Sequence, residues 1–379
     1  MSSTSSVRIG TRVTSGWVVG HVGRIPVVLA PSWLLIAAIL VFLYYPLVGD
    51  LVPSATTGTV VATTLAFVVM LLVSVLLHEL AHGFTAQRFG GRPREYVLTF
   101  WGGHTAFERE LSRPGGSALV AAAGPAANAV LAVAAWLALQ SLDITGPAAL
   151  LLYGALISNG IVAAFNLLPG LPLDGGHILE ALVWAITGDR TRGTIVAAWI
   201  GRVVVVAIAV VLIVVPLVRG GRPDLGSIWI VLVAVFLWMG AGEALRGARA
   251  RQQADSVDLR ALAAPAVTLD TGASLADAEL AGRPGAYVVL VSGGRPVALL
   301  DPAVAGQVPH AARSSTPVSA AARALAPPQI VTAVSGRPAI AAVADAQHHG
   351  PVVVLVDGGG VRGVVEVAAV ARAMRGARP

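Results

Sequence analysis

Residues 67–90 read FVVMLLVSVLLHELAHGFTAQRFG, and this stretch decides both the fold class and the chemistry of the chain. No charged residue occurs from Leu51 to Leu77, and then His78, Glu79 and His82 follow within five positions. A charge at mid-membrane costs about 2.5–3.5 kcal/mol on insertion scales, so a cluster of ionisable groups in an apolar run indicates a functional site. Two histidines four positions apart leave the same face of a helix, and this spacing allows both rings to hold one Zn²⁺. Glu79 is then free to take a proton from a water molecule at the metal.

The composition of the whole chain is that of a membrane protein. Of its 379 residues, 56% are hydrophobic and only 12% are charged, whereas soluble domains usually carry about 25% charged residues. This composition excludes a disordered or fibrous protein. The formal net charge of +6 indicates basic cytoplasmic loops rather than a nucleic-acid partner. Because the chain has 0 cysteines, any metal must be held by histidines and carboxylates.

Six apolar runs approach or exceed the roughly 20 residues needed to cross a bilayer. We expect transmembrane helices near residues 27–48, 57–86, 117–141, 148–169, 194–218 and 226–245. Arginines follow the second and sixth runs, whereas the loops near Asp50 and Asp143 carry none. The positive-inside rule therefore predicts a multi-pass protein of the cell membrane with both termini in the cytoplasm. The loop with Arg219 and Arg222 argues mildly against this orientation.

The composition changes near Arg251, and no later run has transmembrane length. The segments AYVVLVSG and GRPVALLD form one hairpin-like pair, and GPVVVLVD and GVRGVVEV form a similar second pair. We interpret them as an internal duplication in a soluble α/β domain. The chain is thus expected to have an N-terminal cytoplasmic segment (1–25), a transmembrane domain (26–250) and a cytoplasmic C-terminal domain (251–379).

A third metal ligand is expected at the end of the fourth run, where residues 165–180 read FNLLPGLPLDGGHILE. Pro169 and Pro172 break the helix, and irregular backbone at membrane depth survives only inside protein or beside a watery cavity. Asp174 lies in this stretch and could turn toward the two histidines. Taken alone, the stretch would be read as a turn at a membrane edge with a solvated Asp. Beside a histidine pair, Asp174 is a candidate ligand.

The motifs together resemble the site-2 protease family of intramembrane zinc metalloproteases. The resemblance rests on His78-Glu79-x-x-His82, on Asn166-x-x-Pro169-x-x-Pro172-Leu173-Asp174-Gly175-Gly176, and on Gly124-Pro125-Ala126-Ala127-Asn128. It covers about residues 20–245. It implies one Zn²⁺ per chain, bound by His78, His82 and Asp174, with Glu79 as catalytic base. It also implies a transmembrane protein substrate, such as an anti-sigma factor, a pro-sigma factor or a signal-peptide remnant, cut near the cytoplasmic face.

Other polar residues have two readings each. Asn128 and Asn166 are candidates for an oxyanion donor or for holding the substrate, and the alternative is hydrogen bonding between helices. His104 could be a regulatory or extra ligand, but a loop histidine is the simpler reading. His177 could line the site entrance, but a solvated position after the turn is the simpler reading. Residues 94–110 are prone to β structure around Gly102 and Gly103, where the family carries a membrane-associated β-hairpin whose edge could receive an extended substrate.

The C-terminal part resembles a pair of cystathionine-β-synthase (CBS) domains, covering roughly residues 256–311 and 316–375. Nucleotide-binding members of that family often carry an Asp three residues after a Thr or Ser. Here Val304 follows Asp301 and Ala369 follows Glu366, so nucleotide binding is in doubt, and dimerisation or gating of the membrane part is an equal expectation. The alternative function is a CBS-gated ion transporter or channel with an ion site at Asp174. It predicts an inverted repeat and a row of charges, and the sequence shows neither.

Overall fold

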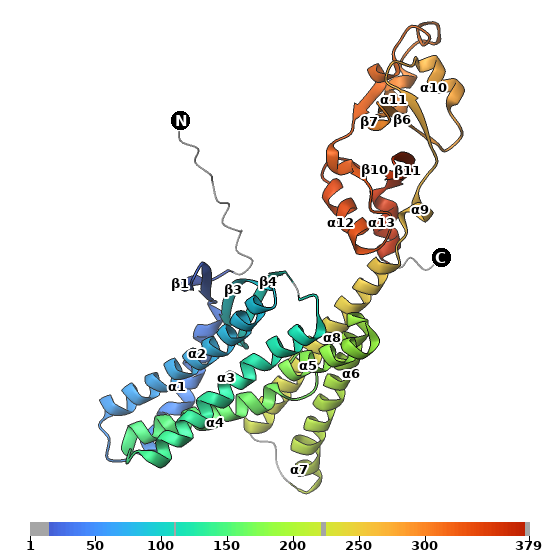
Figure 1. The fold of residues 1–379 in the computed structure, drawn as a ribbon. Helices are drawn as coiled ribbons and strands as arrows, with labels where there is room; N and C mark the ends of the chain where they lie inside the picture. The colour runs from blue at the N-terminus through green and yellow to red at the C-terminus, as the bar shows by residue number, and fades with distance from the viewer. Residues whose placement is uncertain (1–14, 110, 221–224, 376–379) are drawn as a thin grey trace, which may run out of the picture. The chain divides into compact units, whose positions relative to one another are not determined.

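The computed structural model describes residues 15–109, 111–220 and 225–375. The chain divides into two compact units, Met1–Arg246 and Gly247–Pro379 (Figure 1). The first unit is mainly helical and carries a small sheet, and the second is α/β. The expected fold class, a polytopic helical membrane protein with a C-terminal α/β domain, is confirmed.

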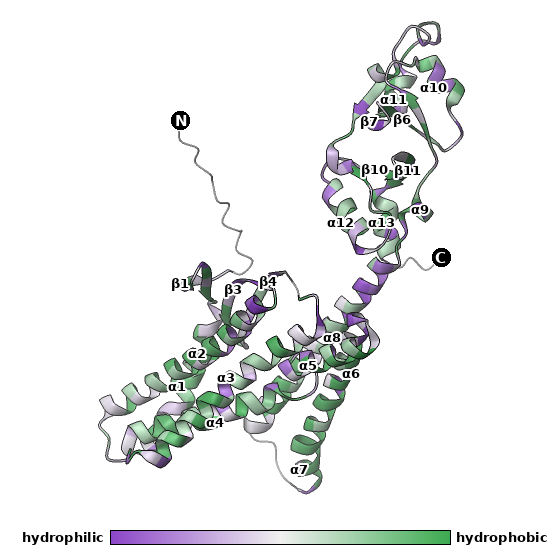
Figure 2. Ribbon diagram, in the orientation of Figure 1, coloured by the Kyte–Doolittle hydropathy of each residue, from purple (hydrophilic) through white to green (hydrophobic). Residues whose placement is uncertain are grey.

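In the described part of the chain, six helices are long and apolar enough to cross a membrane. Their residues are predominantly apolar, as the hydropathy colouring of the ribbon shows (Figure 2). The fifth is a composite, in which a π-helical turn, Val210–Val214, joins two α-helices. The helices are α1 (Ser32–Leu51), α2 (Thr57–Arg88), α3 (Pro114–Ser141), α4 (Gly146–Asn166), α6 with α7 (Arg190–Ala209 and Val215–Val218) and α8 (Leu225–Ser256).

The N-terminal prediction was wrong in part, because the first helix begins five residues later than expected. Residues 27–29 belong to strand β2 (Ile25–Leu29), which pairs with β1 (Trp17–Val22) and, in parallel, with β3 (Arg92–Thr99). Val27 and Val28 are buried in this sheet. A buried β-strand and the start of a transmembrane helix are equally apolar, so hydropathy cannot separate them. Residues 1–14 of the predicted N-terminal segment lie outside the described residues.

The expected hairpin between the second and third spans is confirmed. β3 pairs antiparallel with β4 (Gly102–Arg109), and the sheet order is β1-β2-β3-β4. Tyr96 and Leu98 pack with Val27 against apolar side chains of α2. Tyr96 approaches α2 so closely that a Cβ at Gly83 would lie 2.2 Å from its hydroxyl oxygen. The glycine therefore lets the sheet lie directly on the helix that carries the two histidines.

The chain after α4 differs from the prediction in one respect. α4 ends at Asn166, and Asp174 is the first residue of a further helix, α5 (Asp174–Thr187), rather than part of the unwound stretch. The loop of residues 167–173 packs on α6, where Leu171 N donates a hydrogen bond to Ala197 O at 3.2 Å. A Cβ at Gly170 would lie 2.3 Å from the Cα of Gly201. Two glycines thus allow the backbones of loop and helix to touch.

The C-terminal unit contains two sheets that repeat one plan. In the first, β5 (Ala266–Asp270) lies parallel to β6 (Tyr287–Ser292), followed by antiparallel β7 (Arg295–Leu300) and β8 (Ala322–Ala324). In the second, β9 (Ile330–Val331) lies parallel to β10 (Val352–Asp357), followed by antiparallel β11 (Gly360–Glu366). The helices are α9 (Leu259–Leu262), α10 (Leu275–Ala281), α11 (Pro302–Gly306), α12 (Gly336–Ala346) and α13 (Val367–Met374). The order strand, helix, hairpin occurs twice, as an internal duplication predicts.

Candidate metal centre

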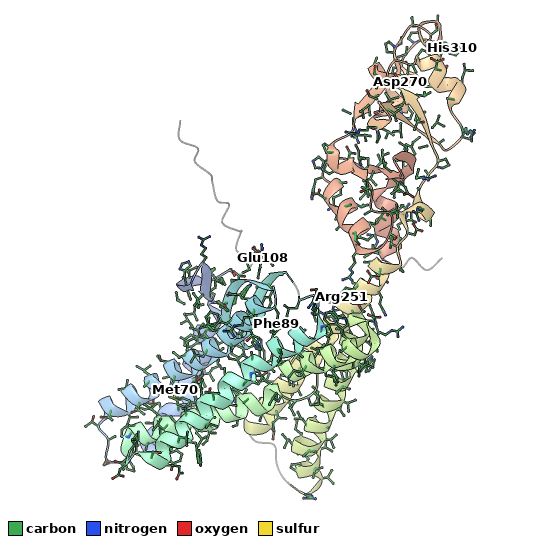
Figure 3. All side chains as sticks on the ribbon, viewed as in Figure 1. Met70, Phe89, Glu108, Arg251, Asp270 and His310 are labelled. Atoms are coloured by element: carbon green, nitrogen blue, oxygen red, sulfur yellow. The ribbon has the colours of Figure 1, made fainter. Side chains whose placement is uncertain are left out.

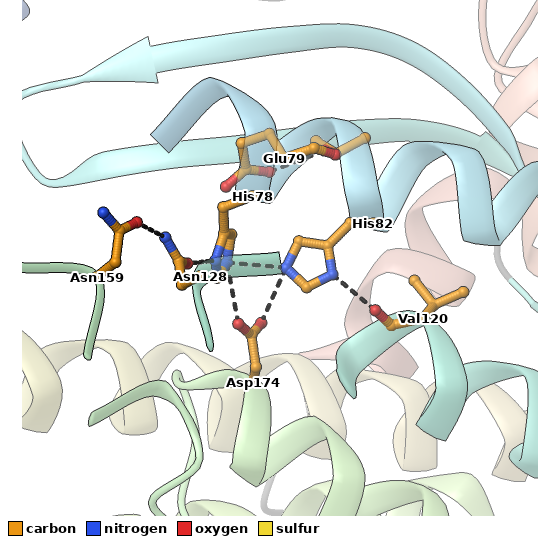
Figure 4. A network of polar contacts seen from close by, with 8 residues as sticks. His78, Glu79, His82, Val120, Asn128, Asn159 and Asp174 are labelled. Atoms are coloured by element: carbon orange, nitrogen blue, oxygen red, sulfur yellow. Dashed lines mark hydrogen bonds and ion pairs between the residues drawn. The ribbon is translucent and has the colours of Figure 1, made fainter. Parts of the chain in front are cut away.

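Three side chains from two helices converge inside the membrane unit. His78 and His82 lie one turn apart on α2, with their Nε2 atoms 3.0 Å from each other (Figure 4). Asp174, at the start of α5, places Oδ2 at 3.1 Å from the Nε2 of His78 and Oδ1 at 3.4 Å from the Nε2 of His82. One ligand atom from each residue lies within 4.8 Å of the others. Both histidines are buried.

The protonation of His82 follows from a backbone contact. Its Nδ1 lies 2.7 Å from the carbonyl oxygen of Val120 on α3. A carbonyl oxygen can only accept a hydrogen bond, so Nδ1 carries the hydrogen. In a neutral imidazole the other nitrogen, Nε2, then bears a lone pair. His82 therefore directs a ligand atom, rather than a proton, toward Asp174.

The hydrogen on Nδ1 of His78 follows from a chain of two side-chain amides, Asn128 and Asn159. Asn159 on α4 donates through Nδ2 to the carbonyl oxygen of Ala155 at 2.9 Å, and this contact sets the orientation of its amide. Its Oδ1 then accepts from Asn128 Nδ2 at 2.7 Å, which leaves Asn128 Oδ1 to accept from His78 Nδ1 at 2.5 Å. Asn159 Nδ2 also lies 3.2 Å from Ser74 Oγ on α2. His78 thus presents a lone pair on Nε2 as well.

The donor set fits a divalent cation. With both rings neutral, two imidazole lone pairs and a carboxylate face one another. Asp174 Oδ2 is buried and has no hydrogen-bond partner, a situation that is costly unless a cation is present. Two histidines and one carboxylate, with their outer nitrogens held by hydrogen bonds, match the pattern of a catalytic zinc site.

The space at the centre depends on a missing side chain. Gly124 of α3 faces the two histidines, and a Cβ at this position would lie 2.3 Å from His82 Nε2 and 2.5 Å from His78 Nε2. Real Cβ atoms essentially never approach so closely. Gly124 belongs to the GPAAN motif, so the glycine of that motif leaves room beside the two histidine rings, and its asparagine, Asn128, holds His78.

Glu79 lies beside the cluster and is 5% exposed. Its Oε2 accepts a hydrogen bond from the hydroxyl of Thr105 on β4 at 2.8 Å. The neighbouring Gly103 lies against the same side chain, and a Cβ there would be 2.4 Å from Glu79 Cγ. The hairpin therefore positions a carboxylate that takes no part in the cluster of ligand atoms.

The remaining candidates lie outside the cluster. Asn166 ends α4, and its side chain makes no hydrogen bond with the described residues. His104 is exposed on β4, opposite Val97. The half-exposed His177 lies 3.2 Å from Glu180, whose other carboxylate oxygen lies 2.8 Å from Arg190 Nε. Although burial alone raises the pKa of Glu180, these two partners lower it to about 2.

Sequence reasoning missed Asn159 and Ser74. Asn159 stands in GALISNGIVAAF, a run whose other members are apolar or small. An amide in a transmembrane helix usually bonds to another helix, and that signal could have identified it. The partner of Asn159 could not be predicted, because it lies 31 positions away on α3.

Comparison with known proteins now adds to the geometry. Residues 66–144 and 140–212 match Peptidase family M50. The membrane unit is similar to M50 peptidases. A candidate zinc metalloprotease of Synechocystis sp. strain PCC 6803, sll0528, is 31% identical over 63% of this chain and 62% of its own. Rip3 of Mycobacterium tuberculosis, another candidate zinc metalloprotease, is 38% identical over 46% of this chain and 44% of its own. The zinc metalloprotease MJ0392 of Methanocaldococcus jannaschii is 29% identical over 47% of this chain and 49% of its own.

The M50 match covers His78, His82 and Asp174, the three candidate ligand residues. The chain spans about half to three-fifths of the length of these curated relatives. Among solved structures, the site-2 protease of M. jannaschii aligns with 61% of this chain and 95% of its own, at 22% identity and a TM-score of 0.42. The CBS domain of a bacterial CNNM/CorC family Mg²⁺ transporter, in complex with ATP, aligns with 34% of this chain and 94% of its own, at 15% identity and a TM-score of 0.27.

Proposed function

We propose that this chain is an intramembrane zinc metalloprotease, a metalloendopeptidase that hydrolyses peptide bonds in transmembrane proteins. The observation that carries the proposal is the convergence of His78, His82 and Asp174, with their ligand atoms bare and within 4.8 Å of one another. The similarity to M50 peptidases supports the same reading. One zinc ion per chain is the expected cofactor.

Each residue of the site has a defined task in this proposal. His78, His82 and Asp174 would hold the ion, which when bound acts as a Lewis acid toward water and the substrate carbonyl. Glu79 accepts a proton from the attacking water and later gives it to the leaving amine. Its position suits the task because Thr105 holds the carboxylate from the side of the hairpin. Asn128, Asn159 and the Val120 carbonyl keep the two rings oriented.

The substrate is proposed to reach the site along the hairpin. β4 forms one edge of its sheet among the described strands, and Gly103 and Thr105 of β4 both contact Glu79. An unpaired strand edge can receive an extended peptide through backbone hydrogen bonds. A transmembrane substrate must unwind to adopt this form. A peptide added at this edge would therefore run past the base.

Orientation and regulation complete the proposal. The arginines that follow the second span support a position of its inner end, and with it of the site, near the cytoplasmic face. Both termini and the C-terminal domain would then be cytoplasmic. The C-terminal domain is proposed to be a CBS pair that modulates activity or mediates a homodimer. Val304 and Ala369 stand where a ribose-binding Asp is expected, so weak or absent ATP binding is proposed.

The test is a matched pair of variants in a reconstituted cleavage assay with zinc content measured in parallel. Glu79→Gln should abolish cleavage and keep about one zinc per chain, because Gln preserves size but cannot accept the proton. Glu108→Gln changes an exposed acid on β4 (Figure 3); this variant is the control and should leave both quantities unchanged. Full turnover by Glu79→Gln would refute the mechanism. Full zinc retention by Asp174→Ala would refute the ligand assignment.

A further inference from the structure

Arg202 is a charged residue within a membrane-crossing helix, and the proposed peptidase site does not use it. It lies on α6, with its guanidinium carbon 5.0 Å from the ring centroid of Trp199 and 4.8 Å from that of Trp238 on α8. Its Nε is buried without a hydrogen-bond partner. Within the described residues, the side chain has cation–π contacts and no ion pair. An arginine at such a position is costly and usually has an anionic partner.

A second arginine points to the same place. A Cβ at Gly242 would lie 3.6 Å from Arg202 Nη2 and 3.6 Å from Arg246 Nη1. The guanidinium groups of Arg202 and Arg246 thus both approach Gly242, which has no side chain. Glu243 pairs with Arg246 through its other terminal nitrogen, Nη2, at 2.5 Å. One acid between two arginines leaves an excess of one positive charge.

An apolar hollow adjoins Arg202. Its volume is about 520 Å³, and apart from Arg202 all of its lining side chains are apolar. Trp199 and Trp238 line it beside the arginine, and the rest of the lining is Val203, Val206, Ala207, Val210 and Val211. Tryptophans of this kind favour the boundary between head groups and hydrocarbon. The positively charged side chain of Arg202 and the apolar hollow therefore lie next to each other on one surface.

We infer that this surface is a binding site for an anionic phospholipid. The phosphate would lie at Arg202 and Arg246, where guanidinium forks match its oxygens, and an acyl chain would fill the hollow. A zwitterionic lipid offers the same tails but brings its own positive charge to the arginines. A free phosphate has no group for the hollow. The inference is independent of the proposed peptidase activity.

Native mass spectrometry of the full chain tests the inference. The protein is presented with equal amounts of phosphatidylglycerol and phosphatidylcholine in detergent, and the ratio of the two retained lipids is measured. The wild type should prefer phosphatidylglycerol. Arg202→Gln should reduce this preference about fivefold, since one arginine near the surface contributes about that factor. Arg202→Lys should keep most of it.

Arg192→Gln is the matched control, because Arg192 is exposed on the same helix and pairs with Asp189 away from the hollow. It should leave the lipid ratio unchanged, and zinc content should be normal in all variants if the fold is intact. Three results would overturn the inference: no preference in the wild type, equal loss in Arg192→Gln, or displacement of the lipid by excess glycerol phosphate. A dimer that is lost in Arg202→Gln would instead identify a second copy as the occupant.

Discussion

The most direct test of the metal centre is the substitution Gly124→Ala. The added methyl group would lie 2.3 Å from His82 Nε2, about 1 Å closer than the shortest ordinary contact of 3.4 Å. The histidines cannot retreat easily, because their Nδ1 atoms are held by Val120 and Asn128. Metal–ligand distances tolerate only about 0.2 Å. We therefore expect zinc affinity to fall by more than the roughly 10–100-fold that follows loss of an outer hydrogen bond.

The assay is zinc competition against a chromophoric chelator, with circular dichroism to confirm that the helices persist. Gly115→Ala is the control, because Gly115 lies in the same helix and no heavy atom lies within 4 Å of its added Cβ. It should bind zinc like the wild type. Wild-type affinity in Gly124→Ala would show that the histidines do not hold the ion in the observed arrangement, and the assignment would fail.

Three further outcomes are expected. Asn159→Leu removes the acceptor that orients Asn128, so zinc affinity should fall about 10–100-fold in the same competition assay; unchanged affinity would contradict the role of the amide chain. Gly103→Ala places a Cβ 2.4 Å from Glu79 Cγ, so cleavage should drop while zinc stays bound, and loss of both would point to a folding defect. Chelation should lower the melting temperature, because an ion at a thousand times its Kd stabilises by about 4 kcal/mol; an unchanged melting temperature would argue against an ion that bridges α2 and α5.

The part of the site that lies within one helix was predictable from sequence. The spacing of His78 and His82 fixes their relation on α2, because helix geometry alone determines it. Asp174 was predictable as a candidate because Pro169 and Pro172 mark a break beside an acid. Its contact with the histidines is an observation of the structure, since sequence contains no information on how close the start of α5 comes to α2.

The errors have equally definite causes. α5 was missed because it is only 14 residues long and opens with Asp174 and two glycines, which have low helix propensity. β2 was included in a transmembrane run because its residues are as apolar as those of α1. Asn159 was missed because a hydrogen bond between helices depends on which faces meet, and an almost uniformly apolar helix does not reveal its faces.

The contact between Gly170 and Gly201 makes the centre sensitive to the sliding of helices. Asp174 follows a loop whose backbone lies against α6, and Gly240 of α8 packs on Pro172 of the same loop. The histidines, in contrast, are positioned by α2, α3 and α4. A displacement of α6 and α8 along the membrane normal by a fraction of an ångström would therefore shift Asp174 relative to the two histidines. Helices adjust to bilayer thickness by tilting, so the thickness of the host membrane would itself tune the affinity for the ion.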